Sequence, residues 1–101
     1  APIHEGLVCG GVEPFWSLRF AEGGARWSAL EGGERAFDAL SPAPARGRHW
    51  PLAISAAGGA MTAILRPALC SDGMADVTRA WTVDLLMDGT LRTGCCRLPS
   101  P

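Results

Sequence analysis

Four residue types are missing from this chain: lysine, tyrosine, asparagine and glutamine occur nowhere in its 101 residues. All nine basic residues are therefore arginine, and this bias, with the abundance of alanine and glycine, is typical of a GC-rich bacterial genome rather than of an arginine-based binding code. No apolar run approaches the roughly 20 residues that a membrane-spanning helix needs. The net charge of −1 provides no long-range field that would attract nucleic acid or an anionic membrane. These absences argue against a transmembrane segment and against a nucleic-acid partner.

The motifs of several enzyme classes are missing as well. The chain contains no G-x-S-x-G, no H-E-x-x-H, no phosphate-binding loop and no dinucleotide fingerprint. The C-x-x-C spacing of many metal sites is also absent, and His4 and His49 have no second ligand at local spacing. We therefore expect a protein that is not an enzyme and needs no cofactor or metal, with both histidines in ordinary surface roles.

The composition that remains is that of one globular domain, residues 1–101, which can remove roughly 60–70% of its unfolded surface from water. Four cysteines in so short a chain predict two disulfides and an oxidising compartment. A metal site is disfavoured because the adjacent Cys95 and Cys96 would point to opposite sides of a strand. The sequence begins at Ala1 and Pro2 without an initiator methionine, as expected after removal of a signal peptide. We expect a periplasmic or secreted monomer.

Alternation of apolar and polar residues predicts antiparallel strands joined by tight turns. Between residues 15 and 21 it places Trp16, Leu18 and Phe20 on one face. A two-residue loop at positions 23–24 would set Phe20 opposite Trp27. A three-residue loop at positions 32–34 would set Ala29 opposite Phe37 and keep that ring on the apolar face.

The second half of the chain shows the same pattern. Loops at Gly58-Gly59 and at Asp88-Gly89 predict two further hairpins, the latter with a type I′ turn. A strict ladder in the last hairpin places Arg92 on the apolar face, which a bulge near Gly94 or an arginine at the mouth of a barrel would explain. Residues 41–48 and 66–80 are expected to be loops, the former a mobile, proline-containing connection.

These strands number seven, with an eighth at residues 7–9. We expect an all-β fold, a small antiparallel meander barrel with disulfides, because closure removes the open edges that invite aggregation. A compact β-sandwich is the alternative.

Two segments of the chain resemble a family of small, mostly uncharacterised exported bacterial proteins, many of them lipoproteins. They are "CGGVEPFW" near the start and "CSDGMAD…WTVDLLMDGTLRTGCC" near the end. The shared positions are Glu13, Pro14, Phe15 and Trp16, then Cys70, Asp72 and Met74, and finally Gly94 and Cys95. The resemblance implies export and a β fold, and it brings no established activity.

The same resemblance bears on the cysteine pairing. Because the family pattern retains Cys70 and Cys95 together, it favours the bridges Cys70–Cys95 and Cys9–Cys96 among the three possible connectivities. Adjacent cysteines on opposite faces also reach different partners more easily than each other. A vicinal Cys95–Cys96 bridge is the least favoured pairing.

The Glu-Pro-Phe-Trp motif, residues 13–16, has a structural interpretation. Pro14 forces an extended conformation on Glu13, so the chain enters the strand in a defined direction. Phe15 and Trp16 point to opposite faces, one covering the barrel and one filling it. Glu13 is expected to be a buried anchor, with Arg92 or backbone N–H groups as its partner. A ligand-facing acid is the alternative.

Two loops are the candidate binding surfaces. Arg46, Arg48 and His49 make the first locally cationic, and Asp72 and Asp76 lie in the second, where capping of a turn is favoured over a cation site. The predicted function is a non-catalytic binding or accessory module for an envelope protein or a small ligand. The alternatives are an inhibitor of an envelope hydrolase of the lysozyme type, and a metal- or haem-handling protein that uses His49, Met61, Met74 or the Asp72 loop.

Overall fold

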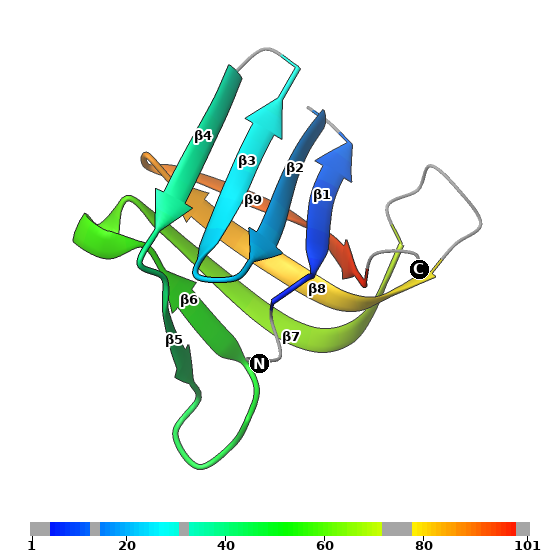
Figure 1. Cartoon of the computed structure of the whole chain (residues 1–101). Coiled ribbons are helices and arrows are strands. Elements are labelled where there is room, and N and C mark those ends of the chain that lie inside the picture. The colour runs from blue at the N-terminus through cyan, green and yellow to red at the C-terminus, as the bar shows by residue number, and fades with distance from the viewer. Residues whose placement is uncertain (1–4, 13–14, 31–32, 72–77, 99–101) are drawn as a thin grey trace.

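The computed structural model describes residues 5–12, 15–30, 33–71 and 78–98. They form one nine-stranded antiparallel sheet in the order β4-β3-β2-β1-β9-β8-β7-β6-β5 (Figure 1). The strands are β1 (Val8–Val12), β2 (Phe15–Ala21), β3 (Gly24–Ala29), β4 (Gly33–Asp38), β5 (Ser41–Pro44), β6 (Leu52–Ser55), β7 (Met61–Ser71), β8 (Thr78–Met87) and β9 (Thr90–Arg97), with one 3₁₀ turn, η1 (Ala57–Gly59), before β7.

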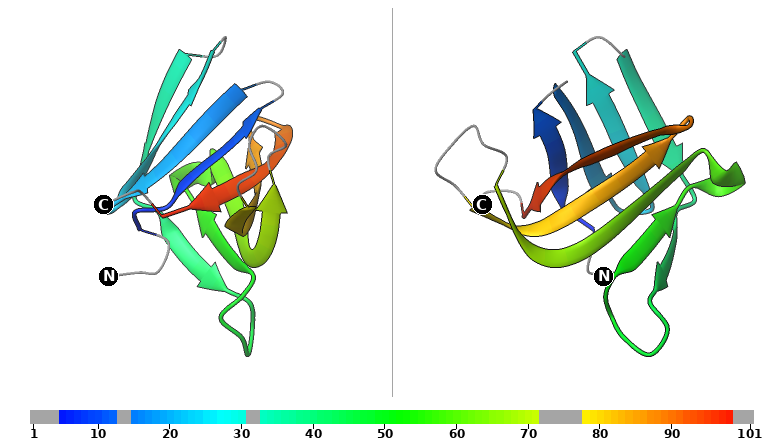
Figure 2. Two further views of the ribbon diagram at one scale, coloured as in Figure 1. Left: turned by 90° about the vertical axis from the view of Figure 1, so that its right-hand side faces the viewer. Right: turned by 180° about the vertical axis from the view of Figure 1, so that it is seen from behind.

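The sheet curls into a half-barrel, which the two views of Figure 2 show from the side and from behind. The first strand pairs with the last, and the two edges of the sheet are β4 and β5, which follow each other in the chain. The predicted all-β antiparallel fold is therefore confirmed, with nine strands where seven or eight were expected. Within the described ranges, no helix is long and apolar enough to span a membrane.

The inner face of the curled sheet holds the core. Because side chains alternate along a strand, each strand contributes every second residue to this face. On β2 the side chains of Trp16, Leu18 and Phe20 are buried, which confirms the predicted apolar face. The most deeply buried large side chains of the core are Leu7, Leu18, Ile54, Met61, Leu65, Val83 and Leu85, joined by the rings of Trp16, Phe20, Trp27 and Phe37.

Two hairpins have the predicted register. In the β6–β7 pair Leu52 lies opposite Leu65, as the Gly58-Gly59 loop predicts. In the β8–β9 pair Met87 lies opposite Thr90, and the two turn residues Asp88 and Gly89 have φ values of 52° and 79°. Two consecutive positive φ values are those of a type I′ turn, whose twist matches that of the strands.

The β2–β3 register differs from the prediction by two residues. Phe20 lies opposite Ala25 rather than Trp27, and Leu18 lies opposite Trp27. The turn therefore forms one position earlier, with Gly23 at φ 75°. Phe37 likewise lies opposite Ala25 rather than Ala29. The register shift is two residues between β2 and β3 and four between β3 and β4, and an even shift leaves every side chain on the same face, so both rings are still in the core.

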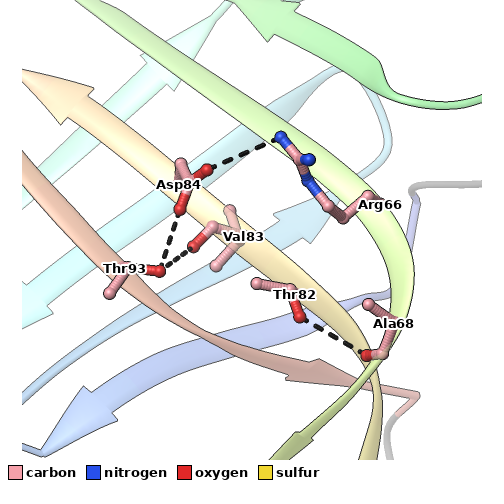
Figure 3. A network of polar contacts seen from close by, with 6 residues as sticks. All are labelled: Arg66, Ala68, Thr82, Val83, Asp84 and Thr93. Atoms are coloured by element: carbon pink, nitrogen blue, oxygen red, sulfur yellow. Dashed lines mark hydrogen bonds and ion pairs between the residues drawn. The ribbon is translucent and has the colours of Figure 1, made fainter.

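Two segments that were expected to be loops are largely strands. Ser41–Pro44 is the edge strand β5, paired with β6, where prolines are tolerated because one side of an edge strand makes no ladder bonds. β7 continues through Pro67 as far as Ser71, and the register shift between Pro67 and Cys70 accommodates the proline. At this irregularity the Thr82 hydroxyl donates to the Ala68 carbonyl at 3.4 Å (Figure 3).

Candidate functional site

Both predicted disulfides are present. Cys9–Cys96 joins β1 to β9 on the inner face, with Cα atoms 4.0 Å apart, and Cys70–Cys95 joins β7 to β9 on the outer face, with Cα atoms 5.5 Å apart. The adjacent cysteines of β9 therefore point to opposite sides of the sheet, as predicted. All four thiols are oxidised, so none is available as a metal ligand or nucleophile.

The two aromatic residues of the opening motif also lie on opposite faces. Trp16 is 3% exposed in the core, whereas Phe15 is 51% exposed on the outer face. Two glycines make room for the Trp16 indole. A Cβ on Gly11 would overlap Trp16 Nε1, and a Cβ on Gly94 would overlap the Gly10 carbonyl and approach Trp16 Cζ2 to 3.0 Å. The glycines of this motif are therefore explained by packing.

On the outer face of β2, β1 and β9 lies a groove of about 400 Å³, which we call the outer groove. Its floor is Gly10, where any side chain would bring its Cβ within 2.8 Å of the Trp16 carbonyl oxygen. Apolar walls come from Val8, Val12 and the half-exposed Phe15. Polar and charged residues of the lining are Ser17, Arg19 and Arg97, and Cys95 lies beside them.

Arginines form a row across this face. Val8 lies opposite Arg97 on one side and opposite Arg19 on the other, and Arg19 in turn lies opposite Arg26. Four neighbouring strands therefore carry three cations at one level of the sheet. No carboxylate oxygen of a described residue lies within 4.0 Å of a guanidinium nitrogen of these three arginines, so they form no ion pair there.

Two other arginines of the described structure, Arg35 and Arg66, have acidic partners. Arg35 of β4 forms an ion pair with Asp88, which lies in the turn between β8 and β9. Arg66 lies 3.8 Å from Asp84, which also accepts a hydrogen bond of 2.8 Å from the Thr93 hydroxyl (Figure 3). Unlike Arg35 and Arg66, the three arginines of the row form no ion pair with a described residue.

Acidic residues do lie near one end of the arginine row. A neighbouring hollow of about 330 Å³ is lined by Arg19 and Arg26 together with Glu22 and Asp38. Arg19 and Arg26 therefore both have acidic residues in their vicinity without forming an ion pair with a described residue. The described lining of the outer groove itself contains no carboxylate.

Arg92 occupies the inner face, and the ladder around it is regular. Val83 lies opposite Gly94, so the predicted bulge at that position is wrong. The regular ladder leaves Arg92 on the inner face, where its guanidinium carbon lies 5.2 Å from the centroid of the Trp27 ring. Arg92 Nη1 and Trp27 Nε1 are both buried without a hydrogen-bond acceptor in the described parts of the chain. Glu13, the predicted partner of Arg92, lies outside those parts, as does Pro14.

The first predicted binding loop is not part of the outer groove. Arg46, Arg48 and His49 are exposed in the connection from β5 to β6, at the far edge of the sheet. Asp72 and Asp76 lie outside the described residues. Where the chain is described, no three histidine, cysteine, aspartate or glutamate side chains are grouped so that they could hold a metal ion.

Comparisons with protein-family models, with curated proteins and with solved structures gave no match. The outer groove was also not predicted from the sequence. The alternation of β2 does place Ser17 and Arg19 away from the core, but Arg97 joins them only through the pairing of the first strand with the last. That pairing leaves no local signal in the sequence.

Proposed function

We propose that the protein is an exported, non-catalytic binding module and that the outer groove is its binding site. Two disulfides support export, because such bridges persist in oxidising compartments and are rare in the cytosol. The module acts as a monomer in the bacterial envelope or outside the cell, on a small ligand.

The groove itself carries this proposal. Its volume of about 400 Å³ falls within the range of roughly 300–1,000 Å³ that is typical of small-molecule sites. It combines apolar walls with a few polar groups, which is the usual composition of such sites. Phe15, half-exposed opposite Val12, offers a ligand an aromatic surface that the fold does not bury.

The scaffold holds the groove in a fixed shape. β1 forms its floor and is hydrogen-bonded to β2 on one side and to β9 on the other. Disulfides on both faces of β9 restrain the third strand. A preformed site loses little conformational entropy when a ligand binds, so a groove of this modest size can still bind usefully.

The polar groups of the groove favour binding over catalysis. Ser17, its hydroxyl-bearing residue, lies 3.2 Å from the Ser28 hydroxyl and has no histidine or carboxylate beside it in the described lining. An activated serine requires an adjacent base. An inhibitor of a basic hydrolase such as lysozyme receives less support, because the arginine row would repel a basic target.

The test is the binding of N-phenyl-1-naphthylamine, a neutral fluorescent aromatic probe. We expect saturable binding at one site, weakened about tenfold by Phe15→Ala because the ring is a large part of the apolar wall. Leu91→Ala is the matched control, since Leu91 is an apolar side chain of β9 that is 69% exposed and does not line the groove. Unchanged binding in Phe15→Ala, or an equal loss in Leu91→Ala, would show that the groove is not the site.

A further inference from the structure

Two arginines face each other across the outer groove. Val8 separates them, with Arg97 opposite it on β9 and Arg19 opposite it on β2. Adjacent strands lie about 4.8 Å apart, so the two Cα atoms are about 10 Å apart and both guanidinium groups can reach one small anion between them. Both side chains line the groove.

These charges are costly for the fold alone. Like charges directly opposite each other in a sheet are destabilising, and Arg19 lies opposite Arg26. Arg97 Nη1 contacts the Leu98 carbonyl at 3.4 Å, and the described residues supply no carboxylate to either groove arginine. Guanidinium groups bind carboxylates and phosphates through paired, charge-assisted hydrogen bonds, so an anionic ligand in the groove would supply a counterion that no described residue supplies within ion-pair distance.

Apart from Ser17, opposite Gly10, the remainder of the groove is apolar. Val12 and Phe15 lie on the same outer face as the two arginines, further along β1 and β2. Gly10 lies between Val8 and Val12 on β1 and has no side chain, so the floor of the groove is open there. A ligand with its charged group at the arginines would therefore extend an apolar part over these side chains.

The backbone of the groove excludes one common kind of ligand. Extended peptides usually bind by adding a strand to a free sheet edge. β1 has no free edge, because β2 and β9 occupy both of its sides. Recognition must therefore come from side chains, which suits a small molecule better than a peptide strand.

We propose that the outer groove recognises an amphiphilic anion, with a carboxylate or phosphate monoester headgroup between Arg19 and Arg97 and an apolar tail over Val12 and Phe15. This inference rests on the proposed function and specifies its ligand class. It assigns the groove arginines to the headgroup and the apolar walls to the tail.

The experiment is calorimetric titration of the whole protein with decanoate and with decyl phosphate, each below its self-association concentration. Decanol, acetate and decyltrimethylammonium are the comparison probes. We expect one anion per protein, with decanol at least about tenfold weaker because it forms no charge-assisted hydrogen bond. Acetate, which lacks the tail, and decyltrimethylammonium, which carries the opposite charge, should give no measurable heat. The ratio of decanoate to decyl phosphate affinity identifies the preferred headgroup.

Variants separate the two parts of the site. Arg19→Gln and Arg97→Gln should each weaken decanoate about tenfold and leave decanol unchanged. Phe15→Ala should weaken both ligands. Arg48→Gln is the matched control, an exposed arginine in the connection from β5 to β6 that lies outside the groove. Near-ultraviolet circular dichroism checks that each variant keeps the native fold.

Three results would overturn the inference: decanol binding as tightly as decanoate, unchanged decanoate binding in both groove variants, or an equal loss in Arg48→Gln. In each case the neutral aromatic probe shows separately whether the groove binds apolar ligands. Loss of that binding in Phe15→Ala would preserve the proposed function while the anionic ligand class is discarded.

Discussion

At the scale of single residues, Phe15 and Trp16 are adjacent in the chain but lie on opposite faces of the sheet. Trp16 fills the core beside Gly11 and Gly94, while Phe15 next to it forms the wall of the outer groove. The sequence predicts this division, because a strand sends successive side chains to opposite faces. It does not predict which of the two rings meets a ligand, since that depends on what lies beside each ring in space.

Truncation of each ring tests this division. Trp16→Ala should lower the free energy of unfolding by about 3–5 kcal/mol, because it leaves a cavity in the core. Phe15→Ala should lower it by only about 1 kcal/mol, because the side chain is half buried on the outer face. Urea denaturation followed by circular dichroism measures both. Equal losses in the two variants would contradict the assignment of the faces.

Arg92 raises a different question at this scale. Its Nη1 is buried beside Trp27 without an acceptor among the described residues, although a buried charge normally requires a partner. The sequence predicts Glu13 as that partner, and this stays a prediction.

A double-mutant cycle with Glu13→Gln and Arg92→Met measures the partnership directly. If the carboxylate and the guanidinium interact, the two effects on unfolding free energy should be non-additive by about 1–3 kcal/mol. The cycle of Glu13→Gln with Arg66→Met is the control, because Arg66 lies on the outer face near Asp84. A coupling energy no larger than in that control would contradict the predicted interaction of Glu13 with Arg92.

At the scale of strands and turns, the register follows the sequence only where the turn is unambiguous. Asp88-Gly89 has one good placement, a type I′ turn, and its hairpin forms as predicted. The segment "EGGA" allows several placements of a two-residue turn, and the chain uses the one that pairs Ala21 with Gly24. The missed strand β5 and the far part of β7 contain prolines, which lower strand propensity but are accepted at an edge and at a bulge.

The disulfides should contribute unequally at this scale. Cys9–Cys96 spans 87 positions of the chain and Cys70–Cys95 spans 25. In the chain-entropy model the former stabilises by about 4–5 kcal/mol and the latter by about 3–4 kcal/mol. Cys9→Ala/Cys96→Ala should therefore unfold at a lower urea concentration than Cys70→Ala/Cys95→Ala. The reverse order would mean that native-state contacts of the outer bridge outweigh chain entropy.

At the scale of the whole molecule, the candidate site depends on closure of the chain ends onto each other. The groove combines Val8 from the beginning of the chain, Arg19 from the second strand and Arg97 from the end. Only the antiparallel pairing of β1 with β9 places them at one level of the sheet. Such pairing between distant segments is decided by the global fold, so the sequence alone pointed instead to the two polar loops.

The most direct test of the central claim, that the outer groove is the ligand site, is a titration of ¹⁵N-labelled protein with decanoate, followed by amide chemical shifts. We expect saturable shifts concentrated on β1, on the Phe15–Arg19 half of β2 and on the Cys95–Arg97 end of β9. Amides of β6 and of the Met61–Leu65 part of β7, which lie away from the groove and from the Cys70–Cys95 bridge, should stay in place. Shifts confined to the connection between β5 and β6, where Arg46 and Arg48 lie, or no saturable shift at all, would contradict it.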